Sequence, residues 1–453
     1  MVLDSGVLRV HRLLRRGPAP VRFFRVGSGG SHVESVRGTL AGRGVGIYIH
    51  MPYCRSTCLF CPYFRGVLRD RGELETYLEA LLREVELYGR ALEDLDLDVV
   101  ELHVGGGTPS LVPPRFYREL RGKLSEFFNL RSGVGIEVNP EDFRNPQLVE
   151  EFYACGVDEV SIGVQSFDAR VLRSIGRKHG PEDGARAVEN SLRAGFRWVN
   201  VDIMFLTPSI RGYAELSLDE KLRAFRRDLG KAVELGAHQV TYYATVVPKG
   251  SPGYRLVEMG RVNQEVDSVD RFVEEALDFA EDRGLHLTRV YSASRGSYEY
   301  ATVNLEMVGP LLGFGAGAWS NTGYYQYVNV HDVGSYVELV REGRYPAIYS
   351  RGLSRSSRAW RLLFDQLSAT AVRYDTFNSL GLGIPLGGRV LLNLMVLAGL
   401  ARRTSYGYRL TRRGIVEVYK SVMNYVVELP VKATEVLRRY GNPANLPEEV
   451  LIE

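Results

Sequence analysis

Six short apolar runs, separated by longer amphipathic stretches, constrain the fold of this chain more than any other feature. The runs are rich in Val and Ile and almost continuously apolar, as buried parallel strands are. Their starts lie 54, 35, 25, 40 and 40 residues apart, which leaves room for a helix in each connection. The pattern predicts an α/β fold whose βα units wind around a full or partial barrel. The runs are Val45–His50, Val99–Val104, Val134–Val138, Glu159–Val164, Val199–Phe205 and Gln239–Ala244.

The stretches between these runs have the apolar spacing of helices. Residues 73–92 place Leu74, Leu78, Leu81 and Val85 three or four positions apart, which predicts a helix with one buried face. Residues 181–195 and 219–236 follow the same spacing. Ser217 lies just before the last of these stretches, and Glu220 follows three residues later, so the two could form a capping box at the start of the helix.

The chain divides into three parts by composition and pattern. Residues 1–44 are rich in Arg and Gly and predict a loosely packed basic arm, residues 45–330 hold the barrel, and residues 331–453 form a smaller, mostly helical domain. Within the last part we expect helices at 356–372 and 388–400, strands at Leu400–Arg402 and Gly407–Leu410, and a helix starting at Thr411. This order predicts a winged-helix-like C-terminal domain.

Bulk properties narrow the class of protein. The 453 residues are 45% apolar and 25% charged, which is ordinary globular composition, and the net charge of +3 is too weak to indicate nucleic-acid or membrane binding by itself. No apolar run reaches the roughly 18 residues of a membrane-spanning helix, and no signal peptide is evident. Three of the four cysteines fall within eight residues, which indicates metal binding in a reducing compartment. We therefore expect a cytoplasmic protein.

Cys54, Cys58 and Cys61 carry the clearest chemical signal. Their spacing is C-x3-C-x2-C, and thiolates suit zinc or iron–sulfur clusters. A structural zinc site takes four ligands, so it would need a residue such as His50. Three cysteines fit a [4Fe-4S] cluster with one iron left open. The motif follows the first expected strand, at the end of a barrel where active sites are built.

Several further segments resemble one known family. The likeness runs from about Tyr48 to Asn329 and is carried, in order, by YIHMPYC, HVGGGTPSLV, IEVNPED, SIGVQSFDARVLRSIGRKH, VNVDIMF and LLGFGAGAWS. These segments resemble the radical-SAM superfamily, within it the oxygen-independent coproporphyrinogen III oxidases and their haem-chaperone relatives. The resemblance implies a partial (βα)6-type radical-SAM barrel. It also implies S-adenosylmethionine on the open iron, from which a 5′-deoxyadenosyl radical is made to abstract hydrogen from the substrate.

The same resemblance implies which residues bind the cofactor. The glycine turn, residues 105–109, would contact the methionyl ammonium of S-adenosylmethionine, and Glu137 would contact a ribose hydroxyl or the ammonium. In the oxidase, the positions matched by Gln165, Arg177 and Asp202 contact a second cofactor molecule. The cofactor is thus one or two molecules of S-adenosylmethionine. Each role has a purely structural alternative: the glycines could form an ordinary tight turn, Glu137 could form a salt bridge, and the aromatic residues could pack in the core. The candidate residues are Tyr48, Phe60, Gly106, Gly107, Thr108, Glu137, Gln165, Arg177, Asp202, Ala244 and Trp319.

The sequence also departs from the family. Cys61 is followed by Pro62, where the oxidase has a further cysteine and the chaperones an acidic residue.

Three functions stay open: a radical enzyme acting on a tetrapyrrole or another small molecule, a radical-SAM C-methyltransferase, and a haem chaperone without turnover. An enzyme needs an electron donor such as flavodoxin or ferredoxin. The arm arginines, among them Arg9, Arg12, Arg22 and Arg25, suit porphyrin propionates or RNA phosphates, or a solvated surface.

Overall fold

A computed structural model describes residues 21–27, 31–40, 42, 44–61, 66–298, 303–439 and 445–452. Its centre is a run of six parallel strands that match the six apolar runs of the sequence. They neighbour one another in chain order, each paired in parallel with the next. The strands are β2 (Gly44–Met51), β5 (Asp98–Gly106), β7 (Val134–Val138), β8 (Val157–Gln165), β9 (Trp198–Phe205) and β11 (Gln239–Ala244).

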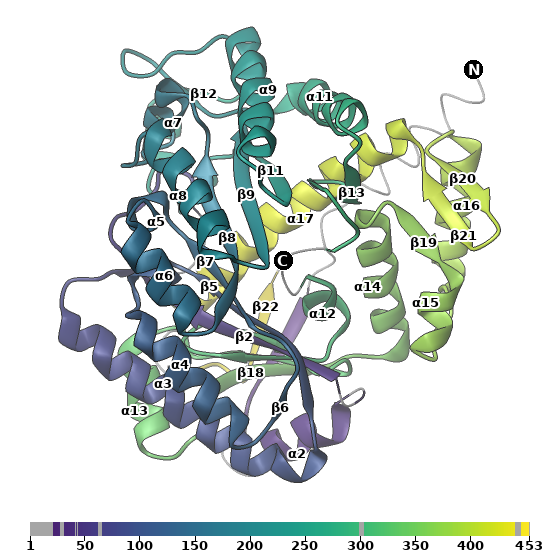
Figure 1. Ribbon diagram of the computed structural model, residues 1–453. Coiled ribbons are helices and arrows are strands. Elements are labelled where there is room, and N and C mark those ends of the chain that lie inside the picture. Colours follow the sequence, from purple (N-terminus) through teal and green to yellow (C-terminus); the bar gives the residue numbers. More distant parts are fainter. Residues whose placement is uncertain are drawn as a thin grey trace.

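Helices connect these strands and cover their outer side (Figure 1). The first, α3 (Arg71–Leu92), buries the apolar stripe expected from its spacing. Ser217 and Glu220 form the expected capping box in front of α9. The other connecting helices are α4 (Pro114–Ser125), α5 (Pro140–Phe143), α6 (Pro146–Ala154), α7 (Ala169–Ser174), α8 (Pro181–Ala194) and α9 (Leu218–Glu234), and α11 (Val269–Asp282) follows the last of the six strands.

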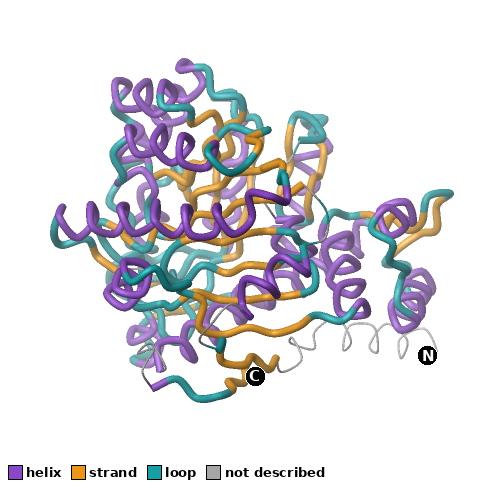
Figure 2. The backbone as a smooth tube through the Cα atoms, turned by 90° about the horizontal axis from the view of Figure 1, so that it is seen from below, coloured by secondary structure: helices purple, strands orange, loops and turns teal. Residues whose placement is uncertain are grey.

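The sheet continues beyond the parallel strands at both sides. β11 is followed by two antiparallel strands, and β2 pairs in parallel with β15 (Leu311–Phe314), after which five antiparallel strands complete the order. The strand order of the described residues is an open path, which agrees with the expected α/β fold with a partial barrel (Figure 2). The added strands are β14 (Ser292–Ser294), β13 (His286–Arg289), β16 (Trp319–Asn321), β17 (Tyr325–Asn329), β18 (Ala347–Gly352), β1 (Val21–Arg25) and β22 (Glu449–Ile452).

Part of the expected N-terminal arm is packed. β1 pairs with β18 and β22, and α2 (Ser31–Thr39) follows it. His32 of α2 is buried and hydrogen-bonded to Tyr88 and Tyr325. The expectation of a loose arm is therefore wrong for these two segments, because their partners lie from 56 to more than 400 positions away and leave no local signal. Arg9 and Arg12 lie outside the described residues.

The C-terminal part has the expected winged-helix-like order. A three-stranded sheet in the order β19-β21-β20 packs with three helices, and a long helix follows. The sheet of the barrel, however, runs on through β18, past residue 330, so the division into domains at residues 44 and 330 stays a prediction. The elements are α14 (Arg355–Ser368), β19 (Ala371–Arg373), α15 (Tyr374–Ser379), α16 (Leu386–Leu397), β20 (Ala401–Thr404), β21 (Gly407–Leu410) and α17 (Arg412–Arg439).

Among the described residues, none of the helices combines the length and the apolar character needed to cross a lipid bilayer.

Candidate cofactor pocket

A pocket opens at the carboxyl ends of the parallel strands, where the loops after β2, β5, β7, β8 and β9 meet. Eleven of the fourteen residues singled out from the sequence line it, although they come from segments up to 148 positions apart. The parallel arrangement explains this convergence, because consecutive strands present the same end to one edge of the sheet. The eleven are Cys54, Cys58, Phe60, Cys61, Gly106, Gly107, Thr108, Glu137, Gln165, Arg177 and Asp202.

The glycine turn after β5 holds the start of the cysteine loop through its backbone. The N–H of Gly107 donates to the carbonyl of Met51 at 2.6 Å, and the N–H of Thr108 donates to that of Tyr53 at 2.7 Å. A Cβ at Gly107 would lie 2.4 Å from the Tyr53 oxygen, and Gly106 has φ +107°. Only glycine fits this close backbone approach, so the turn positions Cys54 directly.

A second anchor reaches the cysteine loop from α5. Arg55 forms an ion pair with the buried carboxylate of Asp142, which also accepts a hydrogen bond from Ser110 Oγ at 2.7 Å. Burial raises the pKa of Asp142, and the Ser110 and Arg55 contacts oppose that shift. Sequence reasoning missed this anchor, because nothing in the motif links Arg55 to a residue 87 positions away.

Three carboxylates line the pocket, and two of them, Glu137 and Asp202, were expected from the sequence; the third is Glu141. Glu137 Oε2 accepts the N–H of Gly106 at 3.1 Å, and its side chain is 46% exposed. Asp202 is half-buried and accepts hydrogen bonds from the Asn200 amide at 2.9 Å and the Ser161 hydroxyl at 3.2 Å. Burial, followed by the negative charge of Glu137, raises the pKa of Asp202 to about 7. The pair thus offers one acceptor for a hydroxyl or ammonium and one group poised to hold a proton near neutral pH.

Arg177 joins the cysteine loop to the strand ends. Its Nη1 lies 3.5 Å from Cys58 Sγ, and its Nη2 donates to Asn139 Oδ1 at 2.9 Å and to the Gly163 carbonyl at 2.7 Å. Asn139 was missed from the sequence, although it lies two positions after Glu137 and so projects from the same side of the extended chain. Gln165 takes φ +67°, a conformation that non-glycine residues rarely adopt.

Three expected residues lie outside the pocket lining. The Tyr48 ring stacks on His103, which in turn lies 3.5 Å from Glu137. The N–H of Ala244 donates to the hydroxyl of Tyr419 in α17 at 2.9 Å. Trp319 packs edge-on against Phe23 of β1. The cofactor roles of these three residues stay predictions, as do the roles of the eleven that line the pocket.

The residues of the pocket fit an iron–sulfur cluster and S-adenosylmethionine by their chemistry. Cys54, Cys58 and Cys61 of one loop all line the pocket, which suits an iron–sulfur cluster, whereas the fourth cysteine, Cys155, lies apart at the end of α6. Glu137 and Asp202 suit ribose hydroxyls or an ammonium, and Arg177 suits a carboxylate. His50 is hydrogen-bonded to the Tyr48 hydroxyl at 3.0 Å and does not line the pocket, which gives no support to zinc. Within the described ranges, no three His, Cys, Asp or Glu side chains are grouped to hold a single metal ion.

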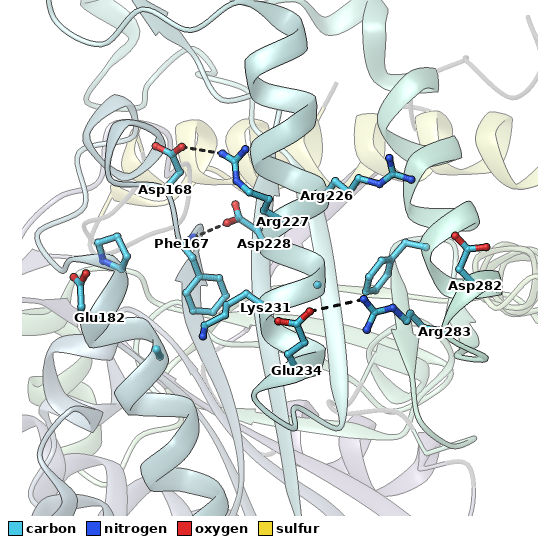
Figure 3. A pocket seen from close by; sticks show the side chains of 14 residues that line it. Phe167, Asp168, Glu182, Arg226, Arg227, Asp228, Lys231, Glu234, Asp282 and Arg283 are labelled. Carbon is cyan, nitrogen blue, oxygen red and sulfur yellow. Dashed lines mark hydrogen bonds and ion pairs between the residues drawn. The ribbon is translucent and has the colours of Figure 1, made fainter.

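A larger cavity, of about 870 Å³, lies outside the barrel between α8, α9 and α11 (Figure 3). Its charged side chains largely neutralise one another, with Asp168 paired to Arg227 and Glu234 to Arg283. The buried Asp228 accepts the N–H of Phe167 at 2.8 Å and so secures the loop after Gln165. None of the four cysteines lines this cavity, and we assign it no chemistry.

Parts of this chain are similar in sequence to known proteins. Residues 48–211 match the Radical SAM superfamily. The chain is 34% identical over 174 residues to the oxygen-independent coproporphyrinogen III oxidase of Pseudomonas aeruginosa, a match that spans 37% of each protein. It is 26% identical to the haem chaperone HemW of Bacillus subtilis, over 66% of this chain and 76% of the chaperone.

Likeness in structure extends further along the chain than likeness in sequence. The solved coproporphyrinogen III oxidase of Escherichia coli, described as a radical SAM enzyme, superposes with a TM-score of 0.71 at 21% identity. The match covers 89% of this chain and 94% of the oxidase. It shows that the two share a fold.

Proposed function

Because this chain carries a radical SAM domain and is related to oxygen-independent coproporphyrinogen III oxidases and haem chaperones, we propose that it is a radical S-adenosylmethionine enzyme. The observation that carries the proposal is the convergence of Cys54, Cys58 and Cys61 with the glycine turn, Glu137 and Asp202 in one pocket. The substrate we propose is a tetrapyrrole, by analogy with the relatives whose names refer to porphyrins and haem.

A [4Fe-4S] cluster and S-adenosylmethionine would together supply the chemistry of this site, the abstraction of a hydrogen atom from the substrate. The role of the protein is to hold the cluster and to orient S-adenosylmethionine beside it. The three thiolates would ligate the cluster, the glycine turn keeps their loop against the strand ends, and Arg177 donates toward Cys58 Sγ. Glu137 accepts from the cofactor, while the raised pKa of Asp202 lets it donate or accept beside Glu137. Catalysis in such a site rests on alignment and the exclusion of water.

Anaerobic reconstitution with iron and sulfide tests the proposal. We expect the wild-type protein to bind about four irons and to release 5′-deoxyadenosine from S-adenosylmethionine after reduction with dithionite. Cys58→Ser should abolish both, and Cys155→Ser should change neither, because Cys155 lies outside the pocket. A cluster that survives Cys58→Ser, or that is lost in Cys155→Ser, would contradict the assignment.

The chaperone relatives favour a second candidate, a haem-delivery protein that retains the cluster. Stoichiometric haem binding without release of 5′-deoxyadenosine would support this candidate over the enzyme. Formation of S-adenosylhomocysteine during turnover would instead identify a C-methyltransferase.

A further inference from the structure

Positive charge is concentrated in one part of the C-terminal region. Residues 354–413, here called the arginine-rich unit, contain ten arginines, two aspartates and neither lysine nor glutamate. Their net charge is +8, so the remainder of the chain carries −5. The weak overall charge of +3 therefore conceals a strong asymmetry, of the kind that indicates an anionic partner.

The unit is placed where a partner can reach it. It comprises α14, β19, α15, α16, β20, β21 and the first two residues of α17, and it projects from the side of the barrel, with α16, β20 and β21 at the outer edge (Figures 1 and 2). Most of its arginines are exposed, among them Arg389, Arg402, Arg403 and Arg409. The pocket at the strand ends is formed by other residues, so a function of this unit is separate from the proposed chemistry.

The hairpin β20–β21 holds two like charges against each other. Arg402 and Arg409 are directly opposite in its register, and both side chains are exposed. Like charges at opposed positions destabilise a strand pair. An anion bound between the two guanidinium groups removes that cost, because arginine offers paired donors to phosphate or carboxylate oxygens.

An exposed apolar stripe runs along α16 beside this hairpin. Leu386, Val390 and Leu397 are 79%, 51% and 73% exposed, and their spacing of four and seven positions puts them on one helix face. Asn393 belongs to the same face and accepts a hydrogen bond from Arg403 Nη2 at 2.8 Å. Apolar side chains and arginines thus adjoin on one surface.

The combination of these features decides between two anionic partners. A nucleic acid attracts arginine through its phosphates, but three exposed aliphatic side chains gain nothing from a polar groove. A bilayer with anionic lipids offers both phosphate oxygens for the arginines and an acyl boundary for the apolar stripe. We infer that the arginine-rich unit docks this protein peripherally on an anionic lipid surface, with α16 lying in the interface.

Sedimentation with vesicles tests the inference on the full-length protein. We expect binding to vesicles of phosphatidylglycerol mixed with phosphatidylcholine, little binding to phosphatidylcholine alone, and weaker binding as salt is raised. Each arginine near an anionic surface strengthens binding roughly fivefold, so Arg402→Gln with Arg409→Gln should weaken it by about 30-fold. Leu386→Ser with Leu397→Ser should weaken it by about tenfold or more, because the apolar contact is lost.

Matched controls separate the surface from general effects. Arg193→Gln removes an exposed arginine, and Met259→Ser a 58% exposed apolar side chain, both on the barrel, and neither should alter vesicle binding. Equal binding to both kinds of vesicle would overturn the inference, as would tight binding of duplex DNA or RNA with no vesicle binding. A dimer that dissociates on Leu386→Ser, without vesicle binding by the wild type, would assign the stripe to a second copy of the chain instead.

Discussion

Single positions in the pocket are constrained by backbone contact as much as by their side chains. Gly107 is the sharpest case, because the atom that a substitution adds would meet the main chain of the cysteine loop. Main-chain atoms cannot rotate away as a side chain can, so the loop itself must move.

We predict that Gly107→Ala reduces the iron bound per chain after reconstitution, while the protein stays folded with a loss of about 1–3 kcal/mol in the free energy of unfolding. Iron content and circular dichroism measure the two effects. Gly122→Ala is the matched control, because no atom lies within 4 Å of the added Cβ in the helix α4. Full iron loading of Gly107→Ala would show that the turn does not position the cysteines.

At the scale of elements, α3 does more than cover the sheet. Its Glu84 is completely buried and accepts from the N–H of Gly315, the Asn329 amide and the Tyr336 hydroxyl, each at 2.7 Å. Tyr77, two turns earlier, donates to the carbonyl of His50 at 2.6 Å. One helix therefore fixes both the turn after β15 and the end of β2, from which the cysteine loop departs.

Burial raises the pKa of Glu84 from 4.5 to about 7, although its three hydrogen bonds oppose the shift. The folded state therefore binds a proton more tightly than the unfolded chain, and the stability from that proton is lost as pH rises through about 7. Glu84→Gln should cost about 1–3 kcal/mol in the free energy of unfolding. We predict that this cost is larger near about pH 5 than near about pH 8.

Urea unfolding of both proteins across this pH range measures the difference. Glu75→Gln, at an exposed position of the same helix, should show no such trend. A cost for Glu84→Gln that is independent of pH would contradict a shifted carboxyl.

The elements also show what a sequence can and cannot reveal. The six parallel strands and the capping box at Ser217 were predictable, because their signals are local periodicity and local hydrogen bonding. Pairing of Val21 with Ile452 was not, since it joins the two ends of the chain. That the candidate residues would meet in one pocket was predictable from the order of the strands. The ion pair Arg55–Asp142 was not, because it joins two side chains that are distant in sequence and leaves no local pattern.

At the scale of the whole molecule, a buried ion pair joins the edge of the barrel sheet to the C-terminal helices. Arg289 at the end of β13 is 0% exposed, and its Nη1 lies 2.7 Å from Asp365 Oδ1 of α14. Burial raises the pKa of Asp365, and the guanidinium opposes that shift. The N–H of Val290 adds a backbone bond to the carbonyl of Ser368 at 2.7 Å.

We predict that Arg289→Met lowers the free energy of unfolding by about 3–5 kcal/mol, because it leaves the Asp365 charge buried without its partner. Adding Asp365→Leu should restore much of that loss. Denaturant midpoints of the single and double variants test this, with Arg283→Met, an exposed arginine nearby in sequence, as the control. If the double variant is as unstable as the single one, packing and not charge stabilises the contact between β13 and α14.

The contact between Tyr419 and the barrel has a consequence for how such proteins diversify. The Tyr419 ring stacks on Tyr242 and lies near Phe205, while its hydroxyl accepts the N–H of Ala244 at the end of a barrel strand. Through this residue the helix α17 is joined to the carboxyl ends of β9 and β11. A C-terminal region exchanged between two such barrels would lose this contact unless the incoming helix also carried a tyrosine at that place. The contact therefore favours keeping the two parts together, whereas exposed side chains of the C-terminal unit can be substituted without touching it.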